Sequence, residues 1–161
     1  MAEREDMGSS GLASSRVWTT VSLRRSGRRP LRFEGALAVA AEMPPTEGRL
    51  GHTIRLFEVS NGEMAVAMEL WTAGCNIPTS DALMIRTAEE LVQACESFDP
   101  RERMSLDSGY PLSGAGRSAG ASKLALELLL EATEADYRAT VLAILRDPCT
   151  QSVAAYIPPT T

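Results

Sequence analysis

The chain has 161 residues, 44% of them hydrophobic and 23% charged, and carries a formal net charge of −5 at pH 7. This length suits one globular domain built around a single core, and this composition argues against a disordered or fibrous chain. No apolar run approaches the roughly 18 residues that a membrane-spanning helix needs. The sequence therefore predicts a protein that has no contact with a membrane.

The first 16 residues contain acids and no apolar stretch, a pattern typical of neither a secretory signal nor a transit peptide. The three cysteines are widely spaced and form no Cys-x-x-Cys pair, so neither a disulfide framework nor a structural zinc site is indicated. We expect a cytoplasmic protein with reduced thiols, no metal and no cofactor.

Two hairpins are predicted in the first half of the chain. Apolar side chains recur at every second position in 17–23 and 31–41, with a turn at Ser26-Gly27, as expected of two half-buried strands. A second hairpin joins strands at 53–60 and 63–71 through Asn61-Gly62, the residues that a two-residue type I′ loop favours.

The two-residue loop fixes the register of the second hairpin, because it places Val59 opposite Met64. One face of the pair then carries six apolar side chains: Phe57, Val59, Met64, Val66, Met68 and Leu70. On the other face Glu58 and Glu69 lie on neighbouring strands, which is the arrangement of a carboxylate pair, although alternation also places polar residues on any water-facing side.

Helices are predicted in the second half, after a short fifth strand at 82–86. Thr87 to Glu90 matches a capping box and begins a helix that ends before Asp99-Pro100, with Cys95 on its apolar face. A second helix is expected at 124–131 and a third from 133 to 146, followed by Asp147-Pro148.

These elements predict an α+β fold in which an antiparallel four- to five-stranded β meander is followed by three helices packed on one face. The expected organisation is a flexible tail at 1–15, a single α+β domain at 16–148 and a C-terminal tail at 149–161. The segment 99–118 has no clear periodicity and is expected to be a loop.

A cluster of arginines stands out against the acidic chain. The segment 16–32 carries six arginines and no acid. With Ser26-Gly27 as the turn, Arg25 faces Arg28 and Arg24 faces Arg29, and such like-charge pairs require an anion nearby. The cluster could be a solvated hairpin tip, or its anion could be an acidic partner protein, a nucleic acid, or the chain's own acids at Glu127, Glu131, Glu134 and Asp136. The candidate partner- or anion-binding residues are Arg24, Arg25, Arg28, Arg29 and Arg32.

The helix at 124–131 is apolar around about two thirds of its circumference, more than one sheet can cover. Either the next helix covers the remainder, or part of it is buried against another chain, as in a homodimer. The candidate self-association residues are Leu126, Leu129 and Leu130.

Patterns that indicate catalysis are weak. His52, the only histidine, opens a strand and is expected at the surface. Cys75 has no base near it in sequence. The glycine-rich segment 114–123 lacks the strand and the Gly-Lys order of a phosphate-binding loop, so we interpret it as a linker.

We therefore expect no catalytic residue, and interpret the chain as a small, non-catalytic binding or regulatory protein that acts through a partner protein or self-association. Nucleic-acid binding through the arginine-rich hairpin at 24–32 is the alternative, and an enzyme of unrecognised class is the second alternative.

Overall fold

The computed structural model describes residues 17–46, 50–71, 79–100 and 119–156, without the side chains of 119–123, 126 and 153–156. The predicted N-terminal tail, Cys75 and all but the first two residues of the predicted loop at 99–118 lie outside these ranges.

Five antiparallel strands form one sheet, ordered as they occur in the chain. They are β1 (Thr19–Leu23), β2 (Leu31–Met43), β3 (Gly51–Val59), β4 (Met64–Trp71) and β5 (Thr79–Ile85). The predicted antiparallel meander is thus confirmed, with β2 and β5 each longer than expected.

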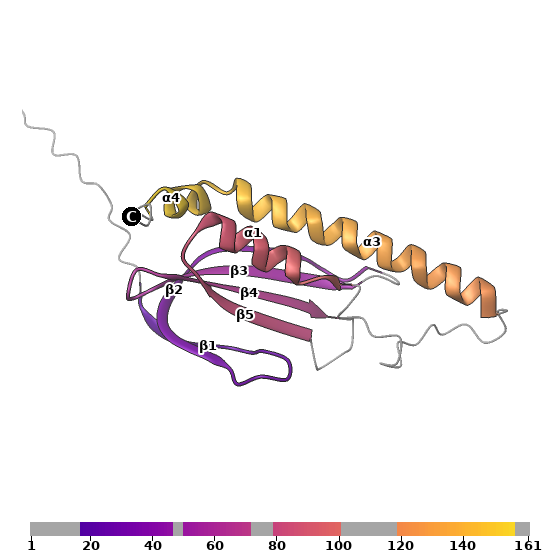
Figure 1. The fold of residues 1–161 in the computed structure, drawn as a ribbon, viewed down its shortest axis with the longest axis horizontal. Coiled ribbons are helices and arrows are strands. Elements are labelled where there is room, and N and C mark those ends of the chain that lie inside the picture. The colour runs from indigo at the N-terminus through magenta and orange to yellow at the C-terminus, as the bar shows by residue number, and fades with distance from the viewer. Residues whose placement is uncertain (1–16, 47–49, 72–78, 101–118, 157–161) are drawn as a thin grey trace, which may run out of the picture.

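The sheet is curled into a half-barrel, as the bend of β1 and β2 in Figure 1 shows. The register of β2 shifts between Leu37 and Val39, and such a bulge bends a strand and increases its twist. Curling brings the two edges of the sheet together: the Ser26 N–H, just after β1, donates to the Ser80 carbonyl of β5 over 2.8 Å. The Ser80 N–H donates in return to Ser26 Oγ over 3.0 Å.

Three helices follow the sheet in the described residues: α1 (Ala88–Ser97), α3 (Ala119–Arg146) and α4 (Pro148–Tyr156). Helix α1 contacts β4 and β5, whereas α3 contacts β2 and β3, so the two helices lie along the same face of the sheet (Figure 1). The N-terminal part of α3 extends past the end of the strands in this view. Three helices after a meander is the predicted α+β arrangement.

The predicted second and third helices are one continuous helix. A third helix was expected to begin at Thr133, but the Thr133 Oγ1 donates to the Leu129 carbonyl over 2.9 Å, the bond of a threonine inside a helix. No proline or glycine separates the two predicted segments, so nothing interrupts the backbone hydrogen bonds between them.

The predicted C-terminal tail is helical up to Tyr156. Asp147-Pro148 does end α3 at Arg146, but it also begins α4. The Cys149 N–H donates to Asp147 Oδ1 over 2.8 Å, so Asp147 is the N-cap and Pro148 occupies the first helical position, which proline tolerates well.

Apolar side chains form two clusters, one on each face of the sheet. The larger cluster lies between the sheet and the helices and includes Ile54, Leu56, Val66, Phe98 and Ile144. The smaller cluster fills the opposite, curled side and includes Leu23, Phe57, Val59 and Ala82.

The predicted register of the β3–β4 hairpin was wrong by one residue. Glu58, not Val59, lies opposite Met64, and the loop has three residues. The Gly62 N–H donates to the Val59 carbonyl over 2.9 Å. Of the three residues in this loop, only Gly62 has a positive φ, of 86°. Asn-Gly also fits this loop, a turn followed by a left-handed glycine. One residue of slip moves Ile54 and Leu56, rather than Phe57 and Val59, to the helix side.

Replacing Gly62 by alanine should lower the free energy of unfolding by about 1 to 2 kcal/mol, because a Cβ disfavours the left-handed conformation. No neighbouring atom lies near the added Cβ, so backbone strain alone accounts for this loss. Urea denaturation measures it. The matched control is Ser60→Ala, in the same loop at a negative φ, which should change stability by less than about 0.5 kcal/mol. Equal effects of the two variants would contradict the left-handed conformation of Gly62.

Candidate functional site

The arginine-rich loop lies between β1 and β2. Its strand pairing ends at Leu23 opposite Leu31, so residues 24–30 lie outside the ladder, and the predicted facing of Arg25 with Arg28 and of Arg24 with Arg29 across paired strands was wrong. The predicted turn at Ser26-Gly27 is confirmed, because the Arg28 N–H donates to the Arg25 carbonyl over 3.1 Å and Gly27 has φ +71°.

Arg25 is neutralised from within the chain. Its Nε lies 3.6 Å from Oδ1 of Asp81, a buried carboxylate on β5 that also accepts a hydrogen bond from the Ala82 N–H. The anion beside Arg25 is therefore Asp81, and it is not one of the helix acids proposed from the sequence. This ion pair and the Ser26–Ser80 hydrogen bonds join the same two edges of the curled sheet.

The four other predicted arginines, Arg24, Arg28, Arg29 and Arg32, are exposed. Within the described part of the chain none of them makes an ion pair. We call these four residues the cationic surface. Arg24, Arg28 and Arg29 lie on the loop that is held in place through Ser26, and Arg32 lies on β2.

The second candidate surface is the outer face of α3. Of the predicted self-association residues, Leu129 and Leu130 are half-buried, and the side chain of Leu126 is not described. The leucines of α3 that remain exposed are Leu124 (57%), Leu128 (57%) and Leu142 (47%).

Helical spacing places these exposed residues on one stripe. Leu128, Ala135 and Leu142 are separated by seven residues each, or about two turns. Glu131 and Arg138 lie on the same stripe, on either side of Ala135, and both are exposed. We call Leu124, Leu128, Glu131, Ala135, Arg138 and Leu142 the outer stripe of α3.

His52 is fully buried (0% exposed), so its predicted surface position was wrong. It lies on β3 with its side chain toward the helices, where Nε2 is 2.6 Å from Thr140 Oγ1 and 3.1 Å from the Asp136 carbonyl. Because Thr140 Oγ1 itself donates to the Asp136 carbonyl, the consistent tautomer carries its proton on Nε2 and donates toward α3.

The surroundings of His52 keep its imidazole neutral. Burial lowers the pKa of His52 below its ordinary value of 6.5, and this outweighs the hydrogen bond to the Asp136 carbonyl and the attraction of the Asp136 carboxylate, which raise it. Nδ1 is buried without a partner in the described structure, so a proton there would lack an acceptor.

Tyr137 is the second buried polar contact of α3. Its hydroxyl donates to the Cys95 carbonyl at the end of α1 over 2.8 Å, and its ring packs edge-on against His52. Cys95 is buried as predicted, and burial raises the pKa of its thiol to about 11. These residues hold α1, α3 and β3 together.

The predicted carboxylate pair is not formed. Glu58 and Glu69 point to opposite faces of the sheet. The observed register differs from the predicted one by one residue, which places Glu58 on the other face of β3. Glu69 instead forms an ion pair with Arg55. In the glycine-rich segment, residues 119–123 are the first turn of α3, and 114–118 lie outside the described residues.

Sequence reasoning missed Asp81 as the partner of Arg25, and Thr140 and the Asp136 carbonyl as the partners of His52. Both contacts join residues far apart in the chain, and the only signal for either is a polar side chain on an otherwise apolar strand or helix face. No group of three histidine, cysteine or acidic side chains in the described ranges could hold a metal ion. None of the helices described there has the length and apolar character to cross a membrane.

Comparisons with protein-family models, with curated proteins and with solved structures gave no match for this chain.

The stability of the fold should decrease as the pH falls below about 6.5. The unfolded chain binds a proton at its histidine first, because the pKa of His52 is lower in the folded state, so the stability is full above pH 6.5 and is lost as the pH falls toward the folded-state pKa. Urea denaturation at pH 7.5 and 5.5 measures the loss.

His52 is the only histidine, so its ring proton resonances report this titration directly. An imidazole in the folded protein that titrates at or above pH 6.5 would contradict the burial argument. The control variant His52→Gln should show a smaller change in stability between the two pH values.

Proposed function

We propose that this chain is a non-catalytic binding protein that acts through protein–protein contacts, and that its first contact is with a second copy of itself along the outer stripe of α3. The observation that carries the proposal is the exposure of Leu124, Leu128 and Leu142 on one side of a helix whose other side is fixed to the sheet. Exposed apolar side chains gathered on one face are typical of interaction surfaces.

The stripe is complementary to itself in an antiparallel arrangement. Leu128 and Leu142 each lie seven residues from Ala135, so a two-fold axis at Ala135 places Leu128 of one copy against Leu142 of the other. The small side chain of Ala135 allows two helices to approach closely at the axis.

The charges of the stripe support the same arrangement. Arg138 lies three residues after Ala135 and Glu131 four residues before it, so Arg138 of one copy comes within about one residue of Glu131 of the other. Opposite charges that meet across an interface fix its register and orientation. Arg138 also bonds Glu134 in its own helix, and this exposed pair contributes little to stability.

Substitution of Leu128 by glutamate should raise the Kd of the dimer by about 100-fold or more, because it places a charge against the apolar Leu142 of the other copy on both sides of the two-fold axis. Sedimentation equilibrium over a range of protein concentrations measures the Kd. The matched control is Leu37→Glu, at a leucine of β2 that is similarly exposed (55%) and lies opposite Phe57, which belongs to the cluster on the face away from the helices.

Charge reversal tests the antiparallel register. Glu131→Arg and Arg138→Glu should each weaken the dimer by about five- to tenfold, and the double variant should recover most of the affinity because the pairing is restored with opposite polarity. A full-length protein that remains monomeric at several hundred micromolar would rule out self-association. Equal losses for Leu37→Glu and Leu128→Glu would remove α3 as its site.

Nucleic-acid binding is the second candidate, favoured by the four exposed arginines of the cationic surface, whose loop is fixed to β5 through Ser26. Four guanidinium groups that neutralise four phosphates predict a log–log salt slope of about −4. Acidic residues elsewhere in the chain, with its net charge of −5, oppose the approach of a nucleic acid at long range.

The variant with Arg24, Arg28, Arg29 and Arg32 all changed to alanine should lose a salt-sensitive gel shift with single- or double-stranded DNA or RNA. Arg146→Ala, at an exposed arginine at the end of α3, is the control and should keep it. The absence of any shift for the unmodified protein at low salt would exclude this function.

A further inference from the structure

The β1–β2 hairpin has one apolar face and one polar face. Four of its side chains pack into the smaller apolar cluster: Val21, Leu23, Leu31 and Phe33. Successive side chains of a strand point to opposite faces, so the residues between these four lie on the other face. They are Thr20, Ser22, Arg32 and Glu34. All of them are exposed, and β1 lies away from the helices in Figure 1. We call this side the outer face of the hairpin.

The cationic surface is continuous with the outer face. The register of the hairpin places Ser22 opposite Arg32, and the ladder ends one pair further on. The loop that follows carries Arg24, Arg28 and Arg29, the three other arginines of the cationic surface. The end of the outer face that lies toward the loop is therefore strongly positive.

An exposed aromatic side chain lies at the other end of the outer face. Trp18 precedes β1 by one residue and is 47% exposed. Alternation carried past the start of β1 places its ring on the outer face, about 13 Å along the strand from Ser22. Trp71 differs, because its Nε1 donates to Thr53 Oγ1 over 3.2 Å. Within the described part of the chain, the indole of Trp18 has neither a hydrogen bond nor a ring contact.

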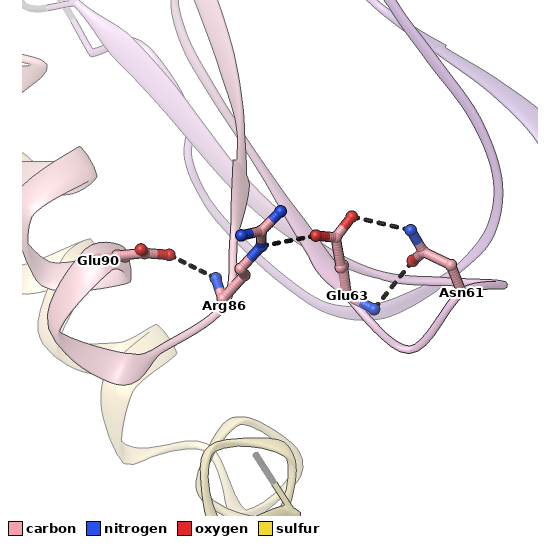
Figure 2. Close-up of polar contacts among 4 residues, drawn as sticks. All are labelled: Asn61, Glu63, Arg86 and Glu90. Atoms are coloured by element: carbon pink, nitrogen blue, oxygen red, sulfur yellow. Dashed lines mark hydrogen bonds and ion pairs between the residues drawn. The ribbon is translucent and has the colours of Figure 1, made fainter. Parts of the chain in front are cut away.

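Most arginines elsewhere in the described ranges are neutralised by an acid. Figure 2 shows one example, in which Arg86 Nε lies 2.7 Å from Glu63 Oε1 while Asn61 donates to the other oxygen. These bonds from Asn61 and Arg86 lower the pKa of Glu63, so the carboxylate stays charged. Arg55 and Arg138 are paired in the same way. The four guanidinium groups of the cationic surface have no such acid in the described residues, so an anion from another molecule can bind them.

We propose that the outer face of the β1–β2 hairpin binds a single-stranded nucleic acid, with phosphates on the cationic surface and one base stacked on Trp18. This inference rests on the nucleic-acid function given above as the second candidate, and it names the form of nucleic acid. A duplex keeps its bases stacked inside the helix, whereas a single strand can offer a base to an aromatic side chain. An acidic peptide supplies negative charge but no base. Because every base has a flat face, no sequence preference is expected.

Glu34 is the acid on the outer face. It lies opposite Thr20, between Trp18 and Arg32 along the hairpin, where a phosphate backbone that joins the two would pass. Its carboxylate repels that backbone. Glu34→Gln keeps the size of the side chain and removes the charge, so it should lower the Kd of a single strand about two- to threefold.

Oligothymidine of about 15 nucleotides and a duplex of the same length are the matched probes, because they separate stacking from charge. Trp18→Ala should raise the Kd of oligothymidine about tenfold and leave that of the duplex unchanged, and Trp18→Phe should keep most of the affinity. Val17→Ala, at an exposed neighbour, is the matched control and should change neither Kd. Fluorescence anisotropy of labelled probes at low salt measures all these Kd values.

Stacking also has a direct spectroscopic readout. Trp18 and Trp71 are the only tryptophans, so Trp71→Phe leaves Trp18 as the single source of indole fluorescence. Oligothymidine should quench this fluorescence with the same Kd as the anisotropy gives. Arg86→Ala should leave the titration unchanged, since this arginine is already paired with Glu63.

The outcomes separate this inference from the function on which it rests. A duplex that binds as tightly as oligothymidine, with no effect of Trp18→Ala, would overturn the single-strand inference and leave nucleic-acid binding in place. Polyglutamate that displaces oligothymidine at equal charge concentration would also overturn it, because charge alone would then decide the binding. The absence of binding by both nucleic acids at low salt would remove the function and the inference together. Leu128→Glu should keep the binding of oligothymidine, so a failure of self-association does not affect this test.

Discussion

The hydrogen bonds between His52 and α3 determine which side of that helix faces the sheet. A buried imidazole without these bonds would be costly, because its Nδ1 already lacks a partner in the described structure. Rotation of α3 about its axis would break the contact to Thr140, and it would also break the contact of Tyr137 with α1. The buried side of α3 is therefore fixed, and with it the outward direction of Leu124, Leu128 and Leu142.

The edges of the sheet are joined by a similar polar contact. Ser26 bonds Ser80 in both directions, and Arg25 lies against Asp81 one residue further along β5. An open sheet edge leaves unpaired N–H and carbonyl groups, and curling β1 toward β5 satisfies some of them. One arginine is used within the chain for this contact, and the neighbouring arginines remain exposed on a loop that the same contact holds in place.

Local sequence patterns predicted the strands and most of the helical residues. The register of the β3–β4 hairpin and the buried polar contacts depend on residues far apart in the chain. Alternation of side chains was sufficient for the order and direction of the strands, because a meander pairs neighbours in sequence. Asn61-Gly62 suits loops of two or three residues, so the turn alone could not fix the register. Thr133 resembles a helix N-cap in sequence, but in the structure it lies in the interior of α3. His52 and Asp136 are 84 residues apart, and nothing local indicates that they meet.

Two side chains of types that often take part in catalysis, His52 and Cys95, are buried in the core of this fold. His52 holds α3 as a neutral, buried donor, and the pKa of the Cys95 thiol, raised to about 11 by burial, keeps that thiol protonated at neutral pH. The described residues leave two features exposed at the surface, the apolar outer stripe of α3 and four guanidinium groups. The stripe lies on α3 and the guanidinium groups lie on β2 and the loop before it, so each can be altered without the other. The proposal of a binding protein is based on these exposed groups.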